Sequence, residues 1–186
     1  MSKNADDQVK RTQISGAYIK TYAYLFSAAR LSIEEAKTEK QDDVVFYKCM
    51  TSIIFLAFCI EAYLNHMGTE EIENWKDDFE SLRPVAKLRL LMSKHDEIDF
   101  SRRPFQSFSE IFDARNQLAH GKTVFAFEKY PKEPLAKWGA LCNVENVKKL
   151  FADTEKMIRI IHTKITNDTG VDPFSLGFKF FGFVQE

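Results

Sequence analysis

The sequence contains little cysteine, glycine or proline, and it carries no excess of positive charge. Its 186 residues include 7 glycines and 5 prolines, so few positions interrupt a helix. The three cysteines, Cys49, Cys59 and Cys142, form neither a CxxC pair nor a disulfide framework, which predicts reduced thiols in a cytoplasmic protein. The net charge of −1 argues against a protein that coats long nucleic acids, although local positive charge could still hold a small RNA footprint.

Several other classes of protein are also excluded by what is absent. The N-terminal residues MSKNADDQ are polar and lack the apolar core of a signal peptide. The apolar run Ser52–Ile60 is ended by Glu61 and is far shorter than the roughly 20 residues that span a membrane. We therefore expect a buried helix and no membrane partner. The sequence has no P-loop, GxGxxG or GxSxG motif and no zinc-type spacing, so we predict no metal and no cofactor.

What the sequence does contain is helical periodicity over most of its length. Apolar residues recur every three or four positions, and 45% of all residues are hydrophobic. We therefore predict one all-α domain over residues 1–186, an up-and-down bundle of four to five helices. The main predicted helices are Thr12–Thr38, Asp42–Met67, one starting near Pro84, Phe105–His120, and one from about Asn143 to Gly170.

The two ends of the chain depart from this pattern. Residues 1–11 are polar and are expected to fray. Residues 171–186 form a tail rich in phenylalanine that should not be left bare in water. The tail could be irregular, could form a short β-hairpin with Val124–Phe127, or could lie on a second subunit.

The most informative stretch is FQSFSEIFDARNQLAHGK, from Phe105 to Lys122. Its apolar residues define one face of an amphipathic helix, and Arg115 falls in the middle of that face, where a guanidinium is costly unless paired. Asn116 and His120 are four residues apart and share a neighbouring face at the end of the helix. Arginine, asparagine and histidine therefore converge near one helix terminus.

A buried carboxylate elsewhere in the chain could form an ion pair with Arg115. Glu61 directly follows the apolar run of the second predicted helix and falls within its buried stripe. We expect the two side chains to meet, directly or through a polar neighbour. The alternative is that Glu61 reaches solvent or caps a local backbone group.

The run RNQLAH at residues 115–120 resembles the Arg–(four to six residues)–His signature of the HEPN family, in which Asn often follows the Arg. The run IEAYLN at residues 60–65 is similar to the central helix of many members, and the resemblance covers roughly residues 42–122. It implies an all-α domain that acts as a metal-independent ribonuclease at a composite site in a symmetric homodimer. His120 and Arg115 would be catalytic, Asn116 would orient a phosphate or the His, and Glu61 would support them.

The chemistry of these residue types suits RNA cleavage by the substrate's own 2′-hydroxyl. Histidine can move protons near neutral pH, and arginine can hold two phosphate oxygens. Arg102, Arg103 and Lys122 flank the helix as candidate RNA contacts, although solvated charge is the simpler interpretation. Two functions stay open: an endoribonuclease of a toxin–antitoxin or phage-defence system with a neutralising protein partner, or a noncatalytic module that binds nucleotide, RNA or protein.

One position departs from the family pattern. HEPN toxins that are paired with nucleotidyltransferase antitoxins often carry Tyr two residues after the His, and this chain has Lys122 there. That particular partnership is therefore in doubt.

Overall fold

The computed structural model describes residues 11–17, 19–95, 98–121, 138–175 and 179–185, with the backbone alone for the first and last of these ranges. The prediction of an all-α bundle is confirmed, and the only strands among the described residues are β1 and β2. The elements are β1 (Arg11–Ala17), α1 (Thr21–Thr38), α2 (Asp42–Glu71), α3 (Trp75–Asp78), α4 (Pro84–Leu91), α5 (Gln106–His120), a 3₁₀ turn (Gly139–Leu141), α6 (Val144–Thr166) and β2 (Lys179–Gln185).

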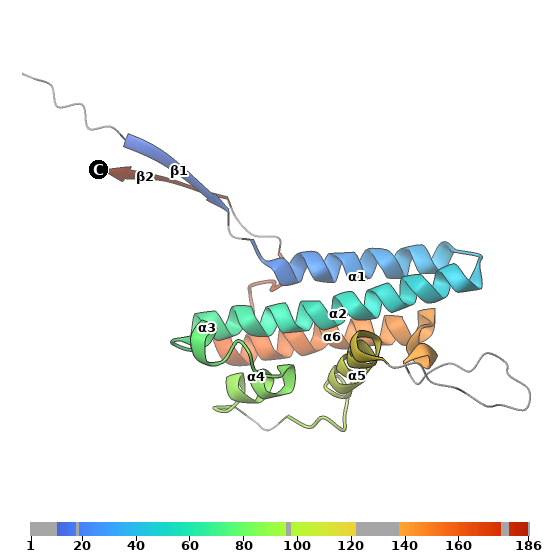
Figure 1. Cartoon of the computed structure of the whole chain (residues 1–186). Coiled ribbons are helices and arrows are strands. Elements are labelled where there is room, and N and C mark those ends of the chain that lie inside the picture. The colour runs from blue at the N-terminus through green and yellow to red at the C-terminus, as the bar shows by residue number, and fades with distance from the viewer. Residues whose placement is uncertain (1–10, 18, 96–97, 122–137, 176–178, 186) are drawn as a thin grey trace, which may run out of the picture.

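Helix α2 is the centre of the bundle. It packs antiparallel along α1 and also contacts α4, α5 and α6, so that it lies between α1 and the α4–α5 side of the molecule (Figure 1). Its buried side includes Ile53, Leu56 and Ile60, as expected for the most apolar helix of the sequence.

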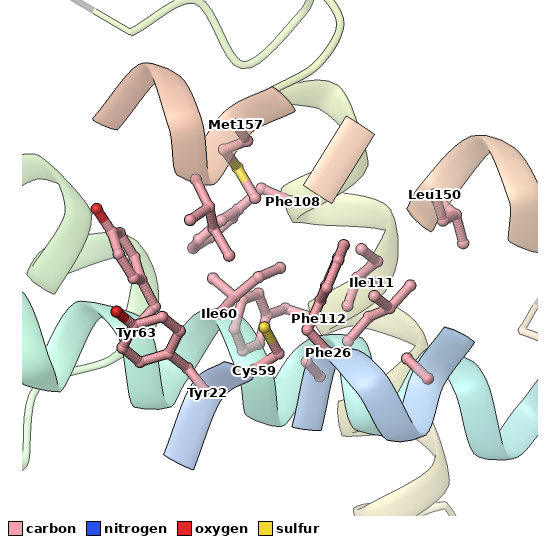
Figure 2. Close-up of a cluster of buried hydrophobic side chains, with 14 of the residues drawn as sticks. Tyr22, Phe26, Cys59, Ile60, Tyr63, Phe108, Ile111, Phe112, Leu150 and Met157 are labelled. Carbon is pink, nitrogen blue, oxygen red and sulfur yellow. The ribbon is translucent and has the colours of Figure 1, made fainter. Parts of the chain in front are cut away.

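The core joins four helices (Figure 2). Figure 2 shows Phe108 of α5 between Ile60 of α2 and Met157 of α6, with Ile111 beside Phe112. Each such fully buried side chain contributes about 1.5–3 kcal/mol to folding. The N-terminal half of α5 is therefore firmly anchored, and this fixes where its C-terminal half emerges.

The opposite side of α2 is only partly covered by the residues that the structure describes. Ile54 and Phe55 are half-buried, Phe58 is 41% exposed, and Tyr47 is also exposed. The run Ile53–Ile60 contains apolar residues on every side of the helix, so its outer side is apolar as well as its buried side. Its outer side therefore presents apolar area that another molecule could cover.

Among the described residues, α2 is the one helix that is long and apolar enough to cross a membrane by length and composition. The core helix of a soluble protein meets the same criterion, and α2 packs against α1, α3, α4, α5 and α6 of this bundle. That the protein is cytoplasmic and has no membrane partner stays a prediction.

The start of the chain differs from what the sequence predicted. Helix α1 begins at Thr21 rather than near Thr12, and residues 11–17 form a strand instead of a helix preceded by a frayed end. β1 pairs antiparallel with β2, in a register that runs from Arg11 opposite Gln185 to Ala17 opposite Lys179. A glycine inside a helix costs about 1 kcal/mol, and pairing with β2 gives the backbone around Gly16 other hydrogen-bond partners.

The phenylalanine-rich tail thus forms a strand with the N-terminal residues, in a ribbon that extends away from the bundle in Figure 1. The alternative pairing with Val124–Phe127 concerns residues outside the described part of the chain. Before β2, Phe174 stacks on Phe26 of α1 with ring centroids 4.0 Å apart. Part of the predicted tail therefore belongs to the core.

The end of α2 was also predicted too early. The sequence placed it at Met67, with Gly68 as a stop, whereas the helix continues to Glu71. Gly68 lies directly against the indole ring of Trp75, and a Cβ at this position would overlap that ring. Gly68 therefore permits a close approach of α3 to α2 rather than ending the helix.

Two other helix boundaries follow the sequence closely. Asn143 caps α6, because its side-chain oxygen accepts a hydrogen bond from the backbone N–H of Asn146 at 2.9 Å. Helix α4 begins at Pro84, whose missing N–H is not needed in a first turn.

The three cysteines are free and buried, as the sequence predicted. Burial raises the pKa of Cys142 to about 12, and it also raises the pKa of Cys59. Protonated thiols are poor nucleophiles, so these cysteines serve packing rather than chemistry.

Candidate functional site

The residues of the RNQLAH run lie on the last turns of α5. Helix α5 crosses α2 steeply rather than running along it (Figure 1), so its N-terminal half is buried and its C-terminal end leaves the core. Ala114 is the last fully buried residue of the helix, and His120 is exposed. The chemistry-bearing residues are therefore presented at the surface by an element whose other half is anchored.

The apolar stripe predicted to continue through Leu118 and Ala119 does not do so. Leu118 is only half-buried and Ala119 is exposed, because no described element covers this end of α5. Arg115 is consequently 29% exposed rather than buried within an apolar face. Water reaches its guanidinium, and this lowers the cost of leaving that charge unpaired.

The predicted pairing of Arg115 with Glu61 is confirmed. Arg115 Nη2 lies 3.8 Å from Glu61 Oε2, and Nη1 donates a hydrogen bond to Asn116 Oδ1 at 3.0 Å. A separation of 3.8 Å is an ion pair without a hydrogen bond. Arg115 is therefore oriented by two neighbours but held tightly by neither.

Glu61 has a second cationic partner that the sequence analysis missed. Lys87 Nζ lies 3.6 Å from Glu61 Oε1, and the Lys87 side chain is only 1% exposed. The sequence did carry a signal, because Lys87 lies beside Leu88 and three residues before Leu90 on a helix that packs against α2. Glu61 thus joins a buried lysine of α4 to the half-exposed arginine of α5.

The main feature of this region's geometry is an open surface pocket between α4 and α5, with a volume of ≈ 660 Å³. Residues of α5 line it in two adjoining rows at three- and four-residue spacing, and the start of α4 supplies the rest of the lining. One row is polar and consists of Ser109, Asp113, Asn116 and His120, and the other consists of Phe108, Phe112 and Arg115. Phe108 and Phe112 are buried and form the apolar floor, and Arg83, Pro84 and Val85 come from the start of α4.

The structure thus brings Arg115, Asn116 and His120 into one pocket, as the sequence predicted, and adds Arg83 from another helix. Nothing in the spacing of the sequence connects Arg83 with the later motif. Only the packing of α4 beside α5, through their shared contacts with α2, places it there.

The three flanking residues that were candidate RNA contacts, with solvated charge as the simpler interpretation, have different surroundings. Arg103 is bound to carboxylates: its Nη1 lies 2.5 Å from Asp153 Oδ2, and its Nη2 lies 2.9 Å from Glu110 Oε2. These contacts tie the start of α5 to α6, which gives Arg103 a structural role and leaves little of its charge for RNA. Arg102 is 85% exposed and pairs with Asp99 at 3.3 Å, whereas Lys122 lies outside the described residues.

A second pocket of ≈ 490 Å³ lies between the start of α1 and the end of α2. Lys20, Asn65 and His66 are among its lining residues. Burial lowers the pKa of His66, and likewise that of His162 on α6, so both imidazoles are mainly neutral at pH 7. The scattered positions of His66 and His162 in the sequence suggest surface or helix-end residues, whereas both are partly buried in the structure.

Within the described ranges, no three His, Cys, Asp or Glu side chains are grouped so that they could hold a metal ion. The candidate site is instead built from two guanidinium groups, an amide and an imidazole around a partly apolar floor. Such a set can bind an anion and move a proton.

Comparison with protein-family models, curated proteins and solved structures finds no match for this chain. The resemblance to the HEPN family therefore depends on the motif residues and their position on α5.

Proposed function

We propose that this chain is a metal-independent endoribonuclease whose site is the pocket between α4 and α5. The observation that carries the proposal is the convergence of Arg115, Asn116 and His120 in one open pocket of ≈ 660 Å³. Two of these side chains are exposed and the third is partly exposed, so an RNA strand could reach all of them.

The reaction requires three things of the protein. The 2′-hydroxyl loses a proton, its oxygen attacks the adjacent phosphorus, and the leaving 5′-oxygen gains a proton while negative charge grows on the phosphate. An imidazole can take or give these protons, because its reference pKa is about 6.5. An arginine can stabilise the phosphate oxygens through paired N–H donors. The products are a 2′,3′-cyclic phosphate and a 5′-hydroxyl.

In this scheme Arg115 is the phosphate-binding residue and His120 is the general acid or base. Asn116 accepts a hydrogen bond from Arg115 at 3.0 Å and so helps to aim the guanidinium. Glu61, at 3.8 Å, limits how far Arg115 can swing away. A phosphate can displace so weak an ion pair, because its oxygens can bond the guanidinium directly.

A single pocket contains one motif histidine, whereas the reaction has two proton transfers. A homodimer would supply a second His120 and a second Arg115 to a shared cleft. The outer side of α2 supports this part of the proposal, because Tyr47, Ile54 and Phe58 lie on it seven and four residues apart and present aromatic and aliphatic side chains. Glu61 follows on the same side three residues after Phe58. A second copy covering this line would end beside Glu61, which contacts Arg115.

The second candidate function is a noncatalytic module that binds RNA, a nucleotide or a protein. The ion pair of Arg115 with Glu61 favours it, because an arginine that is paired with a carboxylate of its own chain can be purely structural. A neutralising protein partner and a role in defence belong to the ribonuclease proposal and depend on it.

The test is incubation of the purified protein with single-stranded RNA in the presence of a chelator. We expect slow cleavage to 2′,3′-cyclic phosphate ends, and no cleavage of the DNA of the same sequence, which lacks the attacking hydroxyl. His120→Ala should abolish turnover by at least about 100-fold, the usual scale of a general acid or base. Because His120 is exposed, this variant should retain the thermal midpoint of the wild type.

Arg115→Ala should also abolish turnover, and Gln117→Ala on the exposed side of the same helix is the matched control. Light scattering tests the shared cleft. Cleavage by a protein that is monomeric at micromolar concentration would remove the dimer from the proposal. Absence of cleavage in every condition, or full activity of His120→Ala, would favour the noncatalytic module.

A further inference from the structure

Arg83 is a cation of the pocket that belongs to no motif. It is the residue immediately before α4, in extended conformation with φ −60° and ψ 145°, and its side chain is exposed. It lines the pocket between α4 and α5 together with the polar row of α5. Arg83 and Arg115 therefore approach the same pocket from two different helices.

Arg83 differs from the other arginines near this site in having no carboxylate partner among the described residues. Arg103 is paired with Glu110 and Asp153, and Arg102 with Asp99. A guanidinium that is exposed in a pocket and lacks an ion pair within the described structure is available to a ligand.

The start of α4 adds to the positive potential around Arg83. An eight-residue helix begins here with Pro84 in its first turn, and that turn contains no acidic residue. The partial positive charge of the helix N-terminus is therefore not neutralised locally. Both sources of positive charge lie on the same wall of the pocket.

The rest of the lining restricts where negative charge can sit. Phe108 and Phe112 form an apolar floor, and Asp113 is the one carboxylate among the lining residues that the structure describes. Asp113 repels phosphate, and the phenylalanines offer it no hydrogen bond. Positive charge for phosphate groups is therefore concentrated at the two arginine-bearing parts of the pocket.

We propose that Arg83 binds a second backbone phosphate of the RNA strand, next to the phosphate held by Arg115. The strand would then cross the pocket with one nucleotide over the apolar floor and a phosphate at each arginine. This inference rests on the proposed function of the pocket, but it assigns Arg83 to binding the strand rather than to the chemical step. Arginine suits the role because it stays charged at every accessible pH and offers a fork of donors to phosphate oxygens.

The test measures binding separately from cleavage. The chain carrying His120→Ala binds a fluorescent single-stranded RNA, and anisotropy is recorded over a series of salt concentrations. Arg83→Ala in this background should weaken binding about tenfold or more, as expected for the loss of a charge-assisted hydrogen bond. The slope of log K against log salt should become shallower by about 0.7, the value for one phosphate contact to a single strand.

Two further variants separate this effect from a general loss of charge or of folding. Arg83→Lys keeps the charge and should keep the slope while losing part of the affinity, because an ammonium lacks the fork. Arg89→Ala removes an exposed arginine of the same helix whose side chain lies over Phe100, outside the pocket, and it should change neither affinity nor slope. Wild-type affinity and slope for Arg83→Ala, or an equal loss for Arg89→Ala, would overturn the inference.

The outcome is also distinguishable from failure of the proposed function. In a chain that retains His120, Arg83→Ala should raise KM and leave kcat nearly unchanged, because binding alone is lost. If the wild type cleaves RNA and Arg83→Ala alters neither KM nor the salt slope, the inference fails while the ribonuclease stands. If the wild type cleaves nothing but binds RNA in an Arg83-dependent way, the ribonuclease fails while the inference stands. If no RNA is bound, the inference is refuted.

Discussion

Removal of Glu61 should destabilise the fold mainly through Lys87 and only slightly through Arg115. Glu61 lies 3.6 Å from Lys87 and 3.8 Å from Arg115, so the two attractions are similar in distance. At about 4 Å and the dielectric typical near a protein surface, each is worth about 4 kcal/mol before desolvation and screening. The difference lies in burial, since Lys87 is 1% exposed and Arg115 is 29% exposed.

These exposures give different costs for the two unpaired cations. Glu61→Ala leaves the Lys87 ammonium buried without a partner, which typically costs about 3–5 kcal/mol. The guanidinium of Arg115 can turn to water, so the loss of its ion pair should cost about 1 kcal/mol or less. We therefore expect Glu61→Ala to destabilise strongly in the wild-type chain and weakly in a Lys87→Met chain, where an apolar side chain of similar length replaces the ammonium.

The assay is a double-mutant cycle by urea denaturation, followed by far-UV circular dichroism. Glu61 and Lys87 should show a coupling free energy of about 2–4 kcal/mol, and Glu61 and Arg115 about 1 kcal/mol or less. Equal costs of Glu61→Ala in the wild-type and Lys87→Met backgrounds would refute the reasoning. A larger coupling free energy of Glu61 with Arg115 than with Lys87 would show that burial does not determine which ion pair contributes more to stability.

Two other predictions concern parts of the bundle away from the pocket. Because burial lowers the pKa of His66 and His162 below their unfolded value near 6.5, the unfolded chain binds more protons, and stability should fall as pH drops from about 6.5 toward their folded pKa values. Urea midpoints at about pH 7.5 and pH 5 check this, and the same fall in a His66→Gln/His162→Gln chain would count against it. Gly68→Ala should cost about 1–3 kcal/mol by forcing Trp75 from its place, with a change in tryptophan emission that Thr69→Ala, at an exposed neighbour, does not produce.

The helices could be predicted from the sequence because helix formation is local. Three- and four-residue spacing of apolar side chains placed α2, α5 and α6 within a few residues of their observed ranges. The same spacing put Arg115, Asn116 and His120 near one helix end, and all three line one pocket. The predicted helix boundaries at Thr12 and Gly68 were wrong because contacts with other segments set the observed boundaries. Residues 11–17 pair with β2, and Gly68 lies against Trp75.

The sequence by itself determined that the chain is a helical bundle, and it determined which helix carries the arginine, asparagine and histidine. The tertiary structure alone decided that Lys87 is buried beside Glu61, that Arg103 is bound by carboxylates, and that Arg83 enters the pocket. Helical periodicity shows which residues share a face, because backbone hydrogen bonds join residues four apart. It does not show which face meets which neighbour, because burial and ion pairing depend on contacts between residues far apart in the chain.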